Sequence, residues 1–213
     1  MFNVELLVFV IFLSLIHILF TLLISNKNYK YYLVHVCFNT FIVYQCIDIS
    51  IPTILNPYQV YILDNHNISY YVITFHIYHM LLYYVNTDEL IHHILMNGIV
   101  LPLSWFYFTN IVITAIVITT GCFGGAIYLL LVLKYFEFIQ KNTMLYLSYI
   151  INIWLRSPAC VIIAYIIFIN YYDKELLLCV PAIICSLACF WNGIYFSYTS
   201  GKSYYKSLNT FNV

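Results

Sequence analysis

Long apolar runs, separated by short polar stretches, occupy almost the whole chain. A transmembrane helix needs about 20 mostly apolar residues. The pattern predicts seven spans, at residues 5–25, 31–51, 69–85, 91–108, 110–133, 143–169 and 175–198. The third and fourth spans are short, and the fourth and fifth meet near Thr109 and Asn110. We therefore expect an all-α polytopic transmembrane helix bundle of about seven spans. Six spans, with the fourth lying partly across the membrane, is the alternative.

Composition supports lipid as the solvent for most of this surface. Apolar residues make up 64% of the 213 positions and charged residues 8%, against about 25% charged in soluble domains. We expect one transmembrane domain over residues 1–213, with its core at about 30–200 and a short polar tail at 201–213. The formal net charge is zero with histidine neutral, which argues against nucleic acid as a partner.

Basic residues predict the orientation of the chain. Seven spans place six lysines on one side of the membrane, namely Lys27, Lys30, Lys134, Lys141, Lys202 and Lys206. The opposite side holds Lys174, and Arg156 falls inside a span. The positive-inside rule then predicts a lumenal N-terminus and a cytosolic C-terminus. The sequon Asn67-Ile68-Ser69 falls in a predicted lumenal loop, so Asn67 is a candidate for glycosylation.

A cluster of ionisable residues, Asp88-Glu89-Leu90-Ile91-His92-His93, opens the fourth span. Ionisable groups near membrane depth usually face a protein interior or a wet cavity and are candidate functional residues. On a helix, Asp88 shares a face with His92, and Glu89 shares one with His93. A carboxylate placed in this way can orient an imidazole for work as a general base or nucleophile. Capping of the helix start is the alternative for the two acids, but it does not explain the adjacent histidines.

A second histidine pair, His76 and His79, lies three residues apart on the third span. Because the connecting turn is short, both pairs are expected at similar depth, where four histidines could converge. Neutral imidazoles suit zinc or iron, but membrane di-iron enzymes use more box histidines than the seven in this chain. We expect no metal here, and we interpret His76 and His79 as hydrogen-bonded between helices. The other histidines, His17, His35 and His66, appear scattered in the sequence.

Arg156 lies deep in the sixth span, two residues before Pro158. An arginine at that depth needs an anionic partner. The candidates are Asp48, Glu137, Asp88, and the phosphate or carboxylate of a lipid. Pro158 predicts a kink in the span.

Glycine and cysteine spacing add predictions about packing and redox chemistry. Gly121 and Gly125 form a G-x-x-x-G pattern, which indicates close helix packing. None of the seven cysteines forms a C-x-x-C pair, so we expect neither disulfides nor a cysteine metal site.

These motifs together resemble the TLC domain family, the membrane fold shared by ceramide synthases and translocating-chain-associating membrane proteins. The acid-then-His-His sequence Asp88 to Leu95 is similar to the family's carboxylate and paired-histidine motif. The glycine-containing span around Gly121 runs into a charged loop, as in the family. The segment Asn152 to Pro158 is similar to the family's aromatic-x-Arg-x-Pro segment, and Trp191-Asn192-Gly193-Ile194-Tyr195 before a basic tail also fits. The resemblance covers residues from about 30 to 200.

The resemblance implies helices around a lipid-accessible cavity in the membrane of the endoplasmic reticulum. It implies acyl transfer from acyl-CoA, as co-substrate, to a sphingoid-type amine, with membrane lipids as partners and no bound cofactor. His92 and His93 would be catalytic, one of them as a base or transient acyl carrier, and Asp88 or Glu89 would orient it. His76, His79 and Arg156 would line the lipid cavity. The homeobox-like region of some synthases is missing here, and many family members that are not synthases keep the fold. A non-enzymatic lipid sensor or regulator of membrane lipid composition is therefore the alternative.

Overall fold

The computed structural model describes residues 4–63, 67–83, 87–105 and 109–209, apart from the side chains of residues 88, 89 and 209. Within these ranges the chain is helical and contains no strand, only an isolated antiparallel bridge between Ile62 and Thr109. The predicted all-α class is confirmed.

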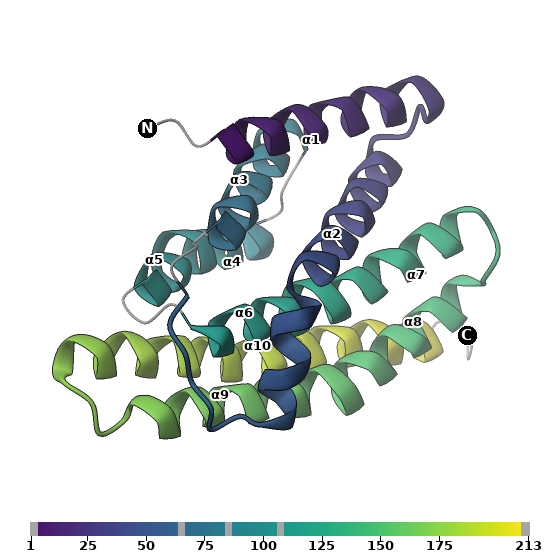
Figure 1. The fold of residues 1–213 in the computed structure, drawn as a ribbon. Coiled ribbons are helices and arrows are strands. Elements are labelled where there is room, and N and C mark those ends of the chain that lie inside the picture. The colour runs from purple at the N-terminus through teal and green to yellow at the C-terminus, as the bar shows by residue number, and fades with distance from the viewer. Residues whose placement is uncertain (1–3, 64–66, 84–86, 106–108, 210–213) are drawn as a thin grey trace.

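Seven helical segments follow one another in the described part of the chain (Figure 1). The first three are α1 (Val4–Leu23), α2 (Lys27–Leu55) and α3 (Asn67–Leu82). The next three are each interrupted by a π-helical segment: α4 (Thr87–Leu95), η1 (Met96–Val100) and α5 (Leu101–Ser104); α6 (Asn110–Ile116), η3 (Val117–Gly124) and α7 (Gly125–Tyr135); α8 (Lys141–Ile150), η4 (Ile151–Arg156) and α9 (Ser157–Tyr171). The last helix is α10 (Leu176–Asn209).

Five of these segments are long and apolar enough to cross a bilayer. They are Val4–Leu23, Lys27–Leu55, Asn110–Tyr135, Lys141–Tyr171 and Leu176–Leu208. The two short predicted spans are also helical, but α3 has 16 residues and the apolar helix Leu90–Ser104 falls below the same length. The protein is thus an integral membrane helix bundle with five clear spans and two shorter helices. The predicted tail is not separate from the last span, since α10 continues to Asn209.

The three helix connections that the structure describes in full lie at two opposite ends (Figure 1). The α1–α2 and α7–α8 connections and the last turns of α10 lie on the right, and the start of α1 and the α9–α10 connection lie on the left. The right-hand end carries Lys27, Lys30, Lys134, Lys141, Lys202 and Lys206, and we call it the lysine end. Tyrosines link its helices: Tyr31 and Tyr128 share a hydrogen bond of 3.1 Å, and Tyr149 and Tyr205 share one of 3.3 Å. The grouping of the six lysines is therefore a property of the fold.

A buried asparagine, Asn110, connects α6 to α2 and to the segment after α2 at the opposite end of the bundle. Its side-chain amide donates to the Thr53 hydroxyl at 2.9 Å and to the Gln59 carbonyl at 3.0 Å, and its Oδ1 accepts from the backbone N–H of Tyr61 at 3.1 Å. The start of α6 is thereby joined to the end of α2 and the segment that follows it.

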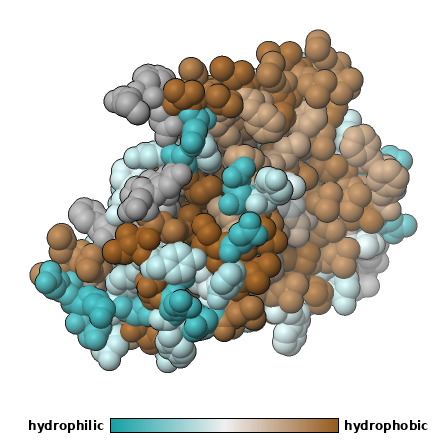
Figure 2. Space-filling view, in the orientation of Figure 1, coloured by the Kyte–Doolittle hydropathy of each residue, from teal (hydrophilic) through white to brown (hydrophobic). Residues whose placement is uncertain are grey.

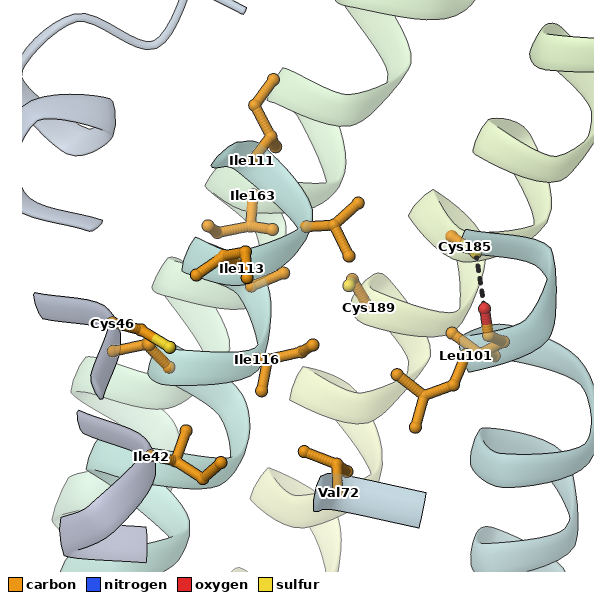
Figure 3. Close-up of a cluster of buried hydrophobic side chains, with 14 of the residues drawn as sticks. Ile42, Cys46, Val72, Leu101, Ile111, Ile113, Ile116, Ile163, Cys185 and Cys189 are labelled. Carbon is orange, nitrogen blue, oxygen red and sulfur yellow. Dashed lines mark hydrogen bonds between the residues drawn. The ribbon is translucent and has the colours of Figure 1, made fainter. Parts of the chain in front are cut away.

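Apolar packing holds the helices together inside, while the outer faces remain apolar. Isoleucines 42, 111, 113, 116 and 163 meet in one buried cluster (Figure 3). Beside it, the Cys185 thiol donates to the Val100 carbonyl at 3.4 Å. Outside, hydrophobic side chains cover the surface over α1 (Figure 2). Such a surface suits lipid as its solvent.

Glycine lets two of these helices approach closely. A Cβ atom added at Gly121 would lie 2.8 Å from Val43 Cγ2, and one added at Gly125 would lie 3.1 Å from the Asn39 Cβ. The G-x-x-x-G pattern therefore packs η3 and α7 against α2, as its spacing indicated.

Candidate functional site

A cavity of about 550 Å³ lies among α2, α3, the three interrupted helices and α10. This volume is within the usual range for small-molecule sites. Its apolar part is formed by side chains such as Val72, Phe75, Leu101 and Ile116, and it reaches Thr199 and Ser203 toward the lysine end. Polar side chains occupy the region between, and these are the groups that could carry chemistry.

All three π-helical segments contribute to this cavity. Met96 comes from η1, Thr119 and Gly124 come from η3, and Asn152 and Arg156 come from η4. A proline explains two of the segments, because Pro102 and Pro158 follow them and a proline has no N–H to donate to the preceding turn. The kink predicted from Pro158 thus takes the form of a widened helical turn. Such turns are frequent at functional sites, and here they converge on one cavity.

Four histidines cluster beside the cavity, and three of them were expected there. The Nε2 atoms of His79 and His93 lie 2.8 Å apart, within hydrogen-bond distance. His76 lies with its ring centroid 4.8 Å from that of His93, and its Nδ1 bonds the Asn97 side-chain oxygen at 2.9 Å. The interpretation of His76 and His79 as hydrogen-bonded between helices is confirmed.

The fourth member of the cluster is His35, which was expected to lie apart from the two histidine pairs. Its ring centroid lies 4.9 Å from that of His79, and its Nδ1 bonds the Tyr31 carbonyl at 2.8 Å. His35 and Asn39 line the cavity from the same face of α2. Their spacing of four residues was a signal in the sequence, but nothing local indicated which helix that face would meet. His17 bonds Tyr83 instead, at 3.1 Å, and His66 lies outside the described residues.

His92 differs from its neighbour in having no histidine bonded to it. Its ring lies against α10, with centroids 6.2 Å from Trp191 and 5.7 Å from Phe196, and it lines the cavity. Its Nδ1 is buried and has no hydrogen-bond partner among the described residues. His93 is instead held by His79. Both histidines line the cavity and each has a buried Nδ1 without a described partner, but the Nε2 of His93 is engaged by His79, whereas no described partner engages His92.

The two acids of the motif lie on α4, but their side chains are outside the described part of the structure. The expected pairs Asp88–His92 and Glu89–His93 therefore stay predictions.

Arg156, the last residue of η4, contacts the same part of α10 that His92 contacts. Its guanidinium carbon is 3.7 Å from the centroid of the Phe196 ring, the ring that also contacts His92. The side chain is 6% exposed, and its Nε has no partner in the described residues. Two expected partners are wrong, because Asp48 and Glu137 are exposed and no ion pair joins either of them to Arg156.

Two buried asparagines extend the polar region, and both lie in motif segments although neither was predicted as a site residue. Asn152 precedes Arg156 by one turn, and Asn192 precedes Phe196 by one turn. Both line the cavity, both are 3% exposed, and the Oδ1 of each has no partner among the described residues. Their signal in the sequence was the helical spacing to Arg156 and to Phe196.

The remaining site predictions concern metals, thiols and the sequon. Among the described residues, no group of three or more His, Cys, Asp or Glu side chains is arranged to hold a metal ion. All seven cysteines are free. Asn67 is the first residue of α3, and its side chain donates to the Glu5 carboxylate of α1.

Comparison of the chain with family models, with curated proteins and with solved structures finds no match. The class defined by fold and site is an integral membrane helix bundle with a polar, histidine-lined cavity.

Proposed function

We propose that this protein is a TLC-type membrane enzyme that transfers an acyl group from acyl-CoA to an amine. A sphingoid-type amine is the first acceptor to test. The observation that carries the proposal is the position of His92, which lines the cavity with an unpaired nitrogen while His79 holds its neighbour His93. We further propose the endoplasmic reticulum as the location, with the N-terminus lumenal and the lysine end cytosolic, in line with the positive-inside rule.

The reaction requires one group that first accepts and then returns a proton, as a general base and then a general acid. The amine nitrogen attacks the thioester carbonyl carbon, and the imidazole of His92 accepts the proton that the nitrogen loses. The C–S bond then breaks, the electron pair leaves with sulfur, and His92 returns the proton to give the free thiol. The products are an amide and CoA, and no net proton is gained or lost. A neutral imidazole near an apolar cavity is suited to both steps.

The cavity supports this proposal in two further ways. Its apolar side, with Val72, Phe75, Leu101 and Ile116, suits an acyl chain, since apolar surface there is removed from water. Its polar end, with Thr199 and Ser203, lies toward the lysine end, where the phosphates of CoA would meet basic side chains.

The test is amide formation in membranes from cells that lack their own ceramide synthases. Sphingoid base and acyl-CoA are supplied, and the parent is compared with His92→Ala and His93→Ala at equal expression. The matched control is His17→Ala, which removes a histidine that bonds Tyr83 outside the cavity. Product from the parent and from His17→Ala, lost in His92→Ala, supports the proposal. Product that persists in His92→Ala contradicts the assigned role.

The alternative is a lipid sensor that uses the same cavity without chemistry. It predicts no amide product from the parent. It also predicts that His92→Gln preserves the effect of the protein on membrane lipid composition, because glutamine keeps a polar group of similar size. The acyl-transfer proposal predicts loss in the same variant.

A further inference from the structure

Arg156 is the starting point of a second inference about the cavity. It is the one formally charged side chain among the described residues that line the cavity. Its described neighbours are the Phe196 ring, the Cys160 thiol, the Tyr128 phenol and the His92 imidazole. None of them carries a formal negative charge at neutral pH. A cation buried in this way is costly unless an anion accompanies it.

The atoms around the guanidinium form a site rather than a lone charge. Asn152 lies on the same helical face as Arg156, and Asn192 projects from the facing turn of α10. Each of the three side chains is at least nine-tenths buried, and each has a polar atom without a described partner. The guanidinium donates N–H groups in a geometry that matches the oxygens of a carboxylate or phosphate. The unpartnered Oδ1 atoms of the two asparagines are acceptors, so they suit a hydroxyl or N–H beside that anion.

The same charge discriminates between ligands. An ammonium placed beside an uncompensated guanidinium is repelled, and the repulsion is strong where little water screens it. A protonated sphingoid base is therefore a poor match for this region. An amphiphile with an anionic headgroup neutralises Arg156 and places its chain along the apolar side of the cavity.

We propose that Arg156 binds the anionic group, a carboxylate or phosphate, of a single-chain lipid held next to His92, while the Oδ1 atoms of Asn152 and Asn192 accept from a hydroxyl or N–H of the same headgroup. The inference deepens the proposed function, on which it rests for the role of the bound lipid as acyl acceptor. It narrows the preferred acyl acceptor to a single-chain amine whose headgroup also carries a carboxylate or phosphate.

The test is binding without turnover, on the purified full chain in nanodiscs of a neutral lipid. Tritiated palmitate is the probe, and unlabelled palmitate, hexadecyl phosphate and hexadecanol compete for it at a pH at which palmitate is ionised. We expect the parent to bind an anionic competitor about 10- to 100-fold more tightly than hexadecanol, the range for a hydrogen bond to a charged group. Tighter binding of hexadecyl phosphate assigns a phosphate headgroup, and tighter binding of palmitate assigns a carboxylate.

Two variants test the residues. Arg156→Gln removes the charge, and Asn192→Asp supplies an internal anion that competes with the ligand for the guanidinium. For these variants binding is measured with tritiated hexadecanol, displaced by each competitor. We expect both to lose the preference for an anion while hexadecanol binds within about threefold of the parent, because its chain contacts are unchanged. Equal binding of acid and alcohol by the parent overturns the proposal without any variant, as does a preference that survives in both variants.

The outcome is separable from that of the acyl-transfer test. His92→Gln is expected to lose amide formation but to retain the preference for an anion. An Arg156-dependent preference in a protein that forms no product would uphold the anion site and reject the enzyme. Product formation with no anion preference would uphold the enzyme and reject the anion site.

Discussion

His79 on α3 and His93 on α4 share a hydrogen bond of 2.8 Å between their Nε2 atoms. When both rings are neutral, one Nε2 carries the proton and the other accepts it, so the two rings hold opposite tautomers. The Nδ1 atoms of both rings are buried without described partners. The bond joins the two shorter helices, which lack the length of the five clear spans.

The pair should therefore show energetic coupling. We expect His79→Ala and His93→Ala each to destabilise the protein, and the double variant to cost less than their sum by about 0.5–1.7 kcal/mol, the range for interhelical hydrogen bonds in membranes. Thermal or denaturant unfolding of the four proteins in one detergent measures the coupling. Additive effects would mean that the two rings do not interact energetically.

Asn110 should be one of the most sensitive polar positions in the chain. Asn110→Ala removes the acceptor for the Tyr61 N–H and the donor to Thr53 and Gln59. Leaving such buried groups unpaired costs about 2–3 kcal/mol. The unfolding midpoint should fall accordingly, while Asn28→Ala, at an exposed position of α2, leaves it nearly unchanged. Equal midpoints for the two variants would contradict the role of Asn110.

Local patterns predicted the helices well, because a run of about 20 apolar residues marks a membrane helix whichever helices pack beside it. The predicted span 31–51 is too short at both ends, since α2 covers Lys27–Leu55. Asn26 caps its start by accepting from the Asn28 N–H, and Pro52 is tolerated inside its last turns. A hydropathy pattern marks the apolar run of a helix, so it misses the more polar turns by which the helix continues beyond that run.

The candidate site was predictable only where its residues are close in sequence. The pair His92 and His93 stands out because charged and polar groups are rare in this chain, and Arg156 stands out for the same reason. His35, Asn152 and Asn192 meet them through helix packing, and the sequence spacing of one helix gives no distance to another. The side chains of Asp88 and Glu89 are undescribed, so their orienting role stays a prediction.

Gly121 offers a packing test with a matched control. In Gly121→Ala the new methyl group would lie 2.8 Å from Val43 Cγ2, so the Val43 side chain or one of the two helices must shift. We expect a loss of about 1–3 kcal/mol, typical of overpacking, and substantial recovery when Val43→Ala is added. Gly98→Ala is the control, because no atom lies within 4 Å of its added Cβ. Unfolding monitored by tryptophan fluorescence compares the variants, and equal loss at both glycines would exclude the contact with Val43 as the cause.

Glycosylation tests the orientation. When the chain is made in cells, we expect a mobility shift that glycosidase treatment removes and that Asn67→Gln abolishes, because the sequon then lies in the lumen. An engineered sequon in residues 201–213 should remain unmodified. Modification of the engineered sequon, with Asn67 never modified, would reverse the orientation. Glu5→Gln can be added to this series, since it weakens the hydrogen bond that the Asn67 amide donates to the Glu5 carboxylate.

Arg156 should cost stability whenever the cavity holds no anion. Arg156→Met replaces a buried cation with an apolar chain of similar length that can keep contact with the Phe196 ring. Because the charge has no described anionic partner, we expect the variant to be more stable than the ligand-free parent by about 1 kcal/mol or more. That difference corresponds to a rise in Tm of roughly 2–4 °C for a chain of this size. Adding hexadecyl phosphate should raise the Tm of the parent but not that of Arg156→Met. A variant less stable than the ligand-free parent would show that the guanidinium serves the fold, and the stability of this protein would then not be limited by its site.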